Sequence, residues 1–525
     1  MSVHGSRQRT PEESTSVAAF YAGRSIFITG GTGFMGKVLV EKILRSCPDV
    51  REIFLLLRPK RGLSIDTRLK KLIELPLFDK LRAENPSCFE KLIPILGDVT
   101  AEGLGLPPVE RRVLIERVSI IFHVAANVRF NENLKKDILS NTRSTRDICI
   151  LAGSMKNLVA LMHVSTAFCQ SDKPVIEEIL YPPPCDWRNT IKMVETLDEK
   201  TLQIFASKYE GSLPNTYTFS KRLAEQVIND YSKDLPCVIF RPSIVISTVE
   251  EPMTGWVDNF NGPVGMMIGG GKGILRVISA KPDICADFLP VDVAIKVMLL
   301  ATWKRGLETV TKNPTTSVYN GSSHSIKRIN IRELNALGLR MSEKMPLDNV
   351  IWYPRTSFAT NAVSHYIMTL LYHVLPALFL DEILKLSGRK PMLLSIQKKI
   401  YSSVVQLDHF VKNEWIFCNS KMINILLEQV PPAEKEIFSY NMAKLDIPDY
   451  FTNCIIGAKT YLLHEDMSPK GLQKTRQHYD RMKLVDTIAR GLLFLMLLSA
   501  MGYLRVHSMI FNSIASISDG SFLDL

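Results

Sequence analysis

A glycine-rich turn near the start of the chain constrains the fold more than any other feature. Residues 25–29 (SIFIT) have the composition of a buried strand, the sequence GGTGFMG follows, and residues 37–45 have the pattern of a helix. Gly30, Gly33 and Gly36 would permit a sharp turn, a close approach of the backbone to a pyrophosphate, and tight packing of helix on sheet. The N–H groups that open the helix would face the anion. This order of elements predicts a dinucleotide-binding unit.

The end of the second predicted strand distinguishes the two nicotinamide cofactors. Residues 52–57 (EIFLLL) are followed by Arg58, Pro59, Lys60 and Arg61. An acidic residue here would bind the ribose 2′-hydroxyl of NAD, whereas a cationic cluster suits the 2′-phosphate of NADPH. We therefore predict NADPH as the cofactor. The alternative is a solvated basic loop.

Two residues at the ends of other strands are candidates for cofactor contacts. Asp98 follows the third predicted strand and could accept a hydrogen bond from the adenine amino group, or it could cap a turn. His123 ends the fourth and would lie beside the ribose and nicotinamide, although a lone histidine is more often structural. The residues predicted to contact the cofactor are Thr29, Gly30, Thr32, Gly33, Phe34, Gly36, Arg58, Lys60, Asp98, His123 and Lys221.

Strands and helices alternate through roughly the first three fifths of the chain, as in parallel sheets. Strands separated by helices imply right-handed crossovers and a sheet covered on both faces. The predicted fold class is α/β, a doubly wound parallel sheet of Rossmann type, with a smaller helical C-terminal domain and a hydrophobic tail. The remaining predictions are strands at 92–96, 118–124, 158–164 and 237–240, and helices at 137–153 and about 217–231.

Tyr217 and Lys221 form a Tyr-x-x-x-Lys pair on one face of a predicted helix. A phenol with a pKa near 10 is a poor proton donor or acceptor at neutral pH. A neighbouring ammonium would favour the phenolate and lower that pKa. The spacing alone is weak evidence, because Tyr479 and Lys483 repeat it in the basic tail.

The position of the pair after the fifth predicted strand is what favours catalysis. That strand ends in Ser165 and Thr166, at the carboxyl edge of the sheet where ligands of such folds bind. A hydroxyl there could hydrogen-bond the carbonyl oxygen that is reduced. We predict Thr166 in this role, with Ser165 as the second choice; the alternative for either is a strand-end cap.

Charge and cysteine content narrow the range of partners. The chain has 64 Lys and Arg against 53 Asp and Glu, a formal charge of +11, which favours nucleic acid, nucleotides, coenzyme A or a membrane surface. No motif of interleaved basic and aromatic residues predicts nucleic-acid binding. The nine cysteines include no Cys-x-x-Cys pair, and no His or Cys spacing predicts a metal site. The absence of a Gly-x-Ser-x-Gly elbow argues against a serine hydrolase.

The composition divides the chain into five segments. The polar start lacks the apolar run of a signal peptide and is predicted to be a disordered arm on the cytosolic side. The later part has long apolar helical stretches, one of them interrupted by Pro376. The predicted segments are a disordered arm at 1–20, an NADP-binding catalytic domain at 21–335, a helical domain at 345–457, a basic linker at 458–483 and a membrane-anchoring tail at 484–511.

The tail carries an uncharged stretch of 14 residues at 491–504. As a helix it would extend about 21 Å, short of the roughly 30 Å hydrocarbon core, so it could be part of a spanning segment, a hairpin or an in-plane anchor. The alternative is a helix buried on its own domain. Basic residues before the stretch predict that its amino-terminal flank faces the cytosol.

Several motifs in fixed order resemble the alcohol-forming fatty acyl-CoA reductases, a family of extended short-chain dehydrogenases. The resemblance covers about residues 17–457 and continues into the tail. Two departures, Met35 and Phe168, replace residues that are more often Leu and Tyr. The matching motifs are ITGGTGFMGKVL (28–39), LLLRPK (55–60), HVSTA (163–167), NTYTFSK (215–221), FRPSIV (240–245), ADFLPVD (286–292) and IWYP (351–354).

The resemblance implies reduction of a long-chain acyl-CoA to a primary alcohol by two hydrides from NADPH, with release of coenzyme A and a transient aldehyde. It assigns proton donation to Tyr217, ribose binding and the lowering of the tyrosine pKa to Lys221, and orientation of the carbonyl to Thr166. The C-terminal domain would help to form the acyl channel. The membrane-associated enzyme would have a cytosolic catalytic domain, at the endoplasmic reticulum or peroxisome.

Other functions remain open at this stage. The same chemistry could act on a sterol, another lipid carbonyl or a sugar-nucleotide, or could stop at the aldehyde. A dinucleotide-binding scaffold without turnover is a third possibility, although the Tyr, Lys and hydroxyl residues are all present. Acyl chain length and oligomeric state are not determined by the sequence.

Overall fold

The computed structural model describes residues 16–60, 62–211, 213–308 and 316–519. Its centre is a seven-stranded parallel sheet in the order β11-β7-β5-β4-β1-β2-β3. This confirms the predicted doubly wound fold. The strands of this sheet are β1 (Ser25–Thr29), β2 (Glu52–Leu57), β3 (Leu92–Leu96), β4 (Val118–His123), β5 (Ala160–Val164), β7 (Cys237–Pro242) and β11 (Ser317–Gly321).

Strand β11 is the one strand of this sheet that the sequence did not predict. Its sequence, SVYNG, is short and contains Asn320, which is fully buried. The Asn320 side-chain amide donates to the carbonyl oxygens of Ile176 (3.0 Å) and Cys418 (2.8 Å), which offsets the cost of burying it. Asn320, whose hydrogen-bond partners are distant in sequence, interrupts the continuous apolar pattern from which buried strands are predicted.

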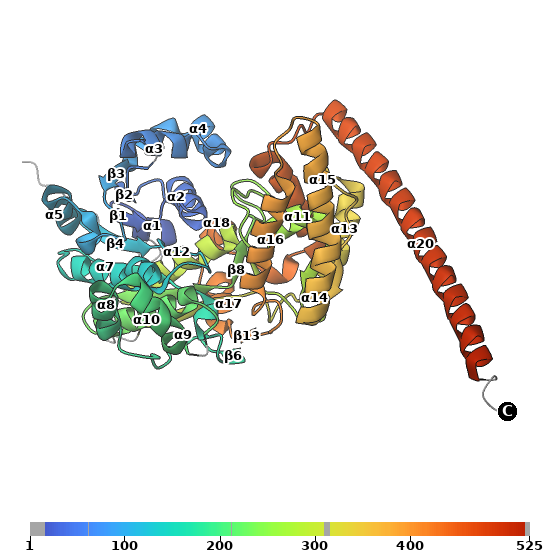
Figure 1. The fold of residues 1–525 in the computed structure, drawn as a ribbon. Helices are drawn as coiled ribbons and strands as arrows, with labels where there is room; N and C mark the ends of the chain where they lie inside the picture. Colours follow the sequence, from blue (N-terminus) through green and yellow to red (C-terminus); the bar gives the residue numbers. More distant parts are fainter. Residues whose placement is uncertain (1–15, 61, 212, 309–315, 520–525) are drawn as a thin grey trace, which may run out of the picture.

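Helices cover both faces of the sheet and enclose two separate cores (Figure 1). On one face lie α1 (Val17–Tyr21), α2 (Phe34–Ser46) and α12 (Val291–Glu308). On the other lie α5 (Pro108–Arg117), α7 (Ser144–Gly153), α8 (Trp187–Thr196) and α10 (Thr216–Tyr231). The strands between them are almost entirely buried, as expected for a parallel sheet packed on two sides.

Two predicted segments differ in detail from the structure. The arm at 1–20 lies mostly outside the described residues, but its end is ordered, because α1 buries Val17 and Phe20. The helix predicted at 137–153 is three pieces: α6 (Leu134–Asp137), a π-helical segment η4 (Ile138–Arg143), and α7.

The later part of the chain is helical, and its helices α13, α17, α18 and α19 pack on the same core as α2 and α12, whereas α16 packs in a separate small cluster. Pro376 does not break the long apolar helix, because the π-helical turn η6 (Leu370–Val374) precedes it and it lies in the first turn of α15. The helices here are α13 (Ile331–Lys344), α14 (Ala362–Thr369), α15 (Leu375–Leu386), α16 (Leu393–Leu407), α17 (Ser420–Leu427), α18 (Lys435–Phe438), α19 (Ile447–Gly457) and α20 (Pro469–Asp519).

The smaller elements connect these layers. Short parallel pairs join distant segments: β6 with β13, β9 with β12, and β8 with β10. Their bounds, with those of the remaining α-helices, are α3 (Ile65–Ile73), α4 (Asp79–Glu84), α9 (Glu199–Glu210), α11 (Pro263–Gly271), β6 (Val175–Ile176), β8 (Ile244–Ile246), β9 (Val277–Ser279), β10 (Phe288–Pro290), β12 (Ser357–Ala359) and β13 (Ile416–Phe417).

Helix α20 continues through the predicted boundary between basic linker and tail without a break and leaves the body of the protein (Figure 1). Most of its apolar side chains beyond Leu484 are exposed, which does not fit a helix buried on its own domain. Among the residues that the structure describes, two helical stretches are long and apolar enough to cross a membrane, Ala362–Leu386 and Pro469–Ile510.

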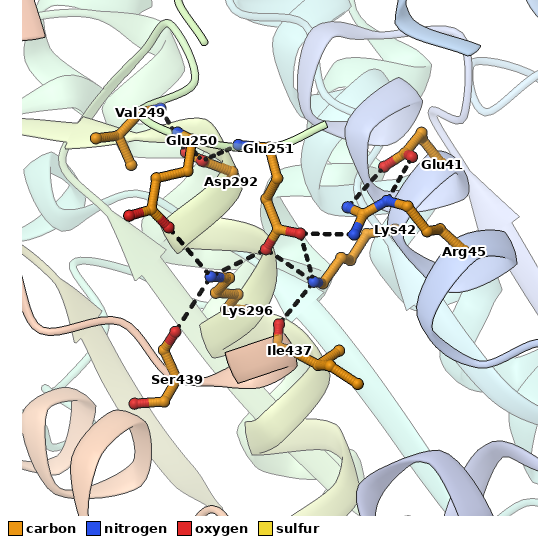
Figure 2. Close-up of polar contacts among 10 residues, drawn as sticks. All are labelled: Glu41, Lys42, Arg45, Val249, Glu250, Glu251, Asp292, Lys296, Ile437 and Ser439. Carbon is orange, nitrogen blue, oxygen red and sulfur yellow. Dashed lines mark hydrogen bonds and ion pairs between the residues drawn. The ribbon is translucent and has the colours of Figure 1, made fainter. Parts of the chain in front are cut away.

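A network of buried ion pairs fixes α2 to the rest of the molecule (Figure 2). The carboxylate of Glu251 accepts hydrogen bonds from Lys42 (2.8 Å) on α2 and lies 2.9 Å from the Lys296 ammonium on α12 and 2.7 Å from the Arg45 guanidinium. The carboxylate of Asp292 accepts the backbone N–H groups of residues 249–251 at 2.8–3.0 Å. The loop that carries Glu251 is therefore held at both its backbone and its side chain.

Candidate active site

The glycine-rich turn between β1 and α2 forms a cradle that side chains would fill. Gly30 has φ +77°, and a Cβ there would lie 2.6 Å from the backbone nitrogen of Ala125. A Cβ on Gly36 would lie 2.1 Å from the carbonyl oxygen of Gly30. Contacts this close are not tolerated, so both positions require glycine. The cradle and the amino end of α2 suit the pyrophosphate of a dinucleotide.

Phe34 and Lys37, in the first turns of α2, are held by the loop after β8. The ring of Phe34 stacks on Trp256 with centroids 5.4 Å apart, and the Lys37 ammonium pairs with Asp258. Phe34 thus supports the turn from the side. Gly33 lies between the two required glycines and donates its N–H to the carbonyl oxygen of Gly30 at 2.8 Å.

His123 and Thr29 lie side by side at the carboxyl ends of β4 and β1. The Nδ1 atom of His123 is 2.7 Å from the Thr29 hydroxyl, and its Nε2 atom is 3.1 Å from the Thr145 hydroxyl. Burial and the nearby Lys221 lower the pKa of His123 to about 3, so the ring is neutral. With both nitrogens occupied, His123 orients Thr29 and presents no free nitrogen to a cofactor.

The predicted basic cluster at the end of β2 gains a member that the sequence interpretation missed. Arg68, on α3, donates to the carbonyl oxygen of Arg58 and, at 3.3 Å, to the hydroxyl of Thr32 in the glycine-rich turn. Burial and the charge of Arg58 lower the pKa of Arg68. The signal was available, because Ser64 caps a helix that begins directly after the basic loop.

Asp98 and Lys60 lie at the rim of this cluster. Asp98 accepts a hydrogen bond from Arg58 at 2.9 Å and also caps Thr100. Hydrogen bonds from Thr100 and Arg58 lower the pKa of Asp98 in spite of its partial burial. Lys60 is exposed and bridges through its backbone to Leu63. Arg58 and Arg68 therefore place two guanidinium groups near the glycine-rich turn, and Lys60 lies exposed two residues after Arg58.

Tyr217 lies at the start of α10, half-buried, with its ring 5.7 Å from that of Phe130. Burial raises the pKa of its phenol well above the ordinary value, and a hydrogen bond with Thr166 acts in the opposite direction. The phenol is protonated at neutral pH. The structure thus brings Tyr217 and Thr166 together from separate elements.

Lys221 occupies a different position from the one that the i, i+4 spacing suggests. Its ammonium donates to the carbonyl oxygen of Val164, at the end of β5, at 2.5 Å. Burial lowers its pKa to about 8, against the attraction of Cys169 and Glu225. Burial of the phenol dominates the pKa of Tyr217, and the lowering of that pKa by Lys221 together with a bound nicotinamide cation stays a prediction.

Ser165 and Thr166 are neighbours in sequence but point to different partners. The Ser165 hydroxyl donates to the Cys169 sulfur at 3.7 Å, whereas Thr166 contacts Tyr217 and caps Phe168. Of the two predicted hydroxyls, Thr166 is the one beside Tyr217. Ser165 contacts Cys169, whose sulfur in turn contacts the buried carboxylate of Glu225.

Two polar groups beneath the site were not predicted. The carboxylate of Glu225 accepts two hydrogen bonds from the Arg241 guanidinium at 2.8 and 2.7 Å, and both side chains are fully buried. Asp137 accepts from the hydroxyl of Thr216 (2.5 Å), the residue before Tyr217. Burial raises the pKa of Asp137 to about 6. These contacts hold both ends of the α10 segment that carries the site. No local sequence motif predicts them.

Comparisons with known proteins identify the family of the chain. Two family models described as male sterility protein match residues 28–298 and 372–465, the first of them an NAD-binding model. The chain is 37% identical over 468 residues to fatty acyl-CoA reductase 1 of Homo sapiens, covering 89% of this chain and 90% of that protein. It is 34% identical over 482 residues to fatty acyl-CoA reductase 2 of Mus musculus, covering 92% of each.

Solved structures support the fold. The terminal R domain of the myxalamid PKS-NRPS pathway superimposes with a TM-score of 0.54 at 18% identity, over 83% of this chain and 90% of that one. The reductase domain of a nonribosomal peptide synthetase from Mycobacterium tuberculosis gives a TM-score of 0.53 at 16% identity, over 86% and 96%. With a nicotinamide-dinucleotide-binding domain and relatives of this similarity along nearly its whole length, the chain belongs to the fatty acyl-CoA reductase family.

Proposed function

We propose that this protein reduces a long-chain fatty acyl-CoA to a primary fatty alcohol with NADPH, releasing coenzyme A through a transient aldehyde. The observation that carries the proposal is the contact of Tyr217 with Thr166 at the carboxyl end of β5. Strand β5 belongs to the same sheet as β1, which leads into the dinucleotide cradle. The relatives of the chain are named fatty acyl-CoA reductases.

The residues would divide the work as follows. The nicotinamide, when bound, supplies a hydride in each of two reductions. Thr166 donates a hydrogen bond that orients the carbonyl oxygen, and Tyr217 donates its proton to that oxygen as negative charge develops. Lys221, whose ammonium contacts the end of β5, would bind the ribose. In the first reduction the carbon–sulfur bond of the resulting hemithioacetal breaks, coenzyme A leaves as the thiol, and the aldehyde remains for the second.

The preference for NADPH over NADH is proposed from the basic cluster. Arg58, Lys60 and Arg68 surround the end of β2, where an acidic residue would bind an unphosphorylated ribose. Arginine matches the geometry and charge of a phosphate group.

Replacing Arg58 or Arg68 with Ala should weaken the binding of NADPH and leave the binding of NADH unchanged. A hydrogen bond to a charged group contributes about 1.5–3 kcal/mol, so KM for NADPH should rise by about tenfold or more in each variant. Steady-state kinetics with both cofactors measure the ratio. The matched control is Arg51→Ala, because Arg51 is an exposed arginine that directly precedes the first residue of β2, at the end of the strand away from the cluster. Equal losses for both cofactors would contradict a 2′-phosphate site.

We also propose that the protein attaches to a membrane through α20, with the catalytic part in the cytosol, at the endoplasmic reticulum or peroxisome. The support is the exposed apolar surface of α20 after its basic first half. A long-chain substrate and product of low solubility would be exchanged at such a surface.

The stoichiometry of the reaction tests the proposed activity. Detergent-solubilised protein with NADPH and acyl-CoAs of increasing chain length should oxidise two NADPH for each coenzyme A released and give a primary alcohol. One NADPH per coenzyme A would identify an aldehyde-forming enzyme. NADPH oxidation with a sterol or another lipid carbonyl, but none with any acyl-CoA, would overturn the proposal in favour of a different lipid substrate.

A further inference from the structure

The apolar helix of 25 residues at Ala362–Leu386 has an inverted amphipathic pattern. Every fourth residue faces the protein, and four of these five buried positions are polar or titratable. A surface helix of a soluble domain normally buries its apolar stripe and exposes its polar one. The buried stripe, each member less than a tenth exposed, consists of His365, Thr369, His373, Ala377 and Asp381.

Specific contacts fix this orientation. The Nε2 atom of His373 accepts the backbone N–H of Arg276 at 2.9 Å. The carboxylate of Asp381 accepts the first backbone N–H groups of α16, from residues 392–394, at 2.9–3.0 Å. The ring of His365 stacks on Tyr401 of α16 at 5.9 Å. The helix therefore cannot turn its apolar side inward without losing these contacts.

The outward side of the helix is apolar and solvent-exposed over its whole length. Val363 is 70% exposed, Phe379 68% and Leu386 89%, and Tyr366, Leu371 and Leu375 lie between them. No Asp, Glu, Lys or Arg occurs between residues 362 and 380. A continuous apolar surface of this size marks a contact with a membrane or another protein.

Basic residues border the apolar side at one end. The turn after α15 and the start of α16 contribute Arg389, Lys390, Lys398 and Lys399, all of them exposed. Lys385 is paired with Glu382 at 2.5 Å. An apolar face bordered by cations is typical of helices that lie in the headgroup region of a bilayer with anionic lipids.

The apolar side is also linked to the base of the proposed membrane tail. Asp486, buried on α20 where its exposed apolar stretch begins, accepts a hydrogen bond from Trp352 at 2.6 Å and pairs with Arg355 at 3.1 Å. The Arg276 guanidinium lies 4.0 Å from Asp486 and 5.4 Å above the ring of Tyr372 on η6. Figure 1 shows α14, α15 and α16 gathered on the side of the molecule from which α20 departs.

We propose that the outward side of α14–α15 lies on the lipid bilayer as a second membrane contact, with the basic residues of the adjoining turn on anionic headgroups. The polar contacts of its inward side keep the helix in the domain, so it lies on the membrane and does not cross it. The inference rests on the membrane attachment proposed for α20. It adds a fixed orientation of the catalytic domain relative to the surface from which a lipid substrate arrives.

Site-specific fluorescence in vesicles of phosphatidylcholine and phosphatidylserine tests this contact. An environment-sensitive probe is attached at Phe379→Cys, at Leu495→Cys on the tail, and at Val109→Cys on α5, three exposed positions in the full-length protein. Wild-type protein labelled in parallel corrects for the native cysteines. Quenchers are bromine atoms on the lipid acyl chains and iodide in the water.

Probes at positions 379 and 495 should be quenched by the brominated lipid, and the probe at 109 by iodide alone. If lipid quenches the probe at position 495 but the probe at 379 is as accessible to iodide as the probe at 109, the tail is attached to the membrane and the second contact is overturned. A probe at 379 shielded from both quenchers would also overturn it, because a protein, such as a second copy of this chain, would then cover the face. Iodide quenching at all three positions would contradict both membrane contacts.

Discussion

Replacement of Tyr217 with Phe is expected to lower kcat for acyl-CoA reduction by about 10²–10⁴-fold, the usual contribution of a positioned proton donor. Burial raises the pKa of this phenol, so the hydroxyl carries its proton at neutral pH. The variant loses the oxygen but keeps the ring and its contact with Phe130. NADPH affinity, measured by fluorescence titration, should therefore stay unchanged while turnover falls.

The chain provides a matched control in the basic tail. Tyr479 and Lys483 repeat the spacing of Tyr217 and Lys221, and Tyr479 is buried against Tyr353. Tyr479→Phe removes the same atom from the same spacing, far along the chain from Thr166. We expect it to retain most of the wild-type kcat. Comparable losses in both variants would mean that the effect at Tyr217 is not proton donation.

Product analysis of the Tyr217 variant separates the two reductions. In the proposed mechanism both reductions place negative charge on an oxygen that Thr166 would orient, so both should slow when the Tyr217 hydroxyl is removed. A variant that still released coenzyme A and accumulated aldehyde would show that another group protonates the first intermediate. Assays that start from acyl-CoA and from the free aldehyde distinguish these outcomes.

The sheet could be predicted from sequence because parallel strands packed on two sides are short apolar runs. Six of its seven strands satisfy this rule, whereas β11 carries the buried Asn320. The seventh strand depends on hydrogen bonds from that side chain to carbonyls of β6 and of the segment after β13. Such partners are far apart in sequence, and no local pattern shows them.

Some features of the candidate site could likewise be predicted from the sequence, and others could not. The cradle and the pairing of Tyr217 with Thr166 follow from motifs at strand ends, which topology brings to one edge of the sheet. The direction of a side chain does not follow from spacing: Lys221 turns to the Val164 carbonyl, and His123 is held between two threonines. These orientations depend on burial and on competing partners, which a sequence does not display.

Replacement of Glu251 with Gln is expected to lower the free energy of unfolding by about 3–5 kcal/mol, as when one partner of a buried ion pair is removed. Glu251 faces three cations, and the Lys42 and Lys296 side chains are 3% and 2% exposed (Figure 2). Arg45 retains Glu41 as a partner, but the two ammonium groups lose their closest carboxylate. Chemical denaturation of detergent-solubilised protein measures the difference.

Glu250→Gln is the matched control, one residue away. Its side chain is 60% exposed and 4.0 Å from the Lys296 ammonium, so removal of its charge should cost less than about 1 kcal/mol. A similar loss in both variants would indicate a general dependence on negative charge in this loop and contradict the special role of Glu251.

The difference between wild type and Glu251→Gln should depend on pH in both directions. The three cations lower the pKa of Glu251 to about 2, below its ordinary value of 4.5. A carboxylate with a lowered pKa in the folded state stabilises fully above the unfolded value and loses that effect as the pH falls through the folded one. The difference should therefore shrink as the pH falls from about 4.5 toward 2.

The difference should also shrink as the pH rises toward 8. Burial, together with the charges of Arg45 and Lys296, lowers the pKa of Lys42 to about 8 in spite of Glu251, which raises it. Without Glu251 the folded variant therefore releases the Lys42 proton at a lower pH than wild type and is relieved of the unpaired charge. The loss in Glu251→Gln should thus be largest near pH 5 and should fall to a constant, smaller value above about pH 8. A loss that stayed constant from acid to alkaline pH would show that the variant disturbs packing and not charge.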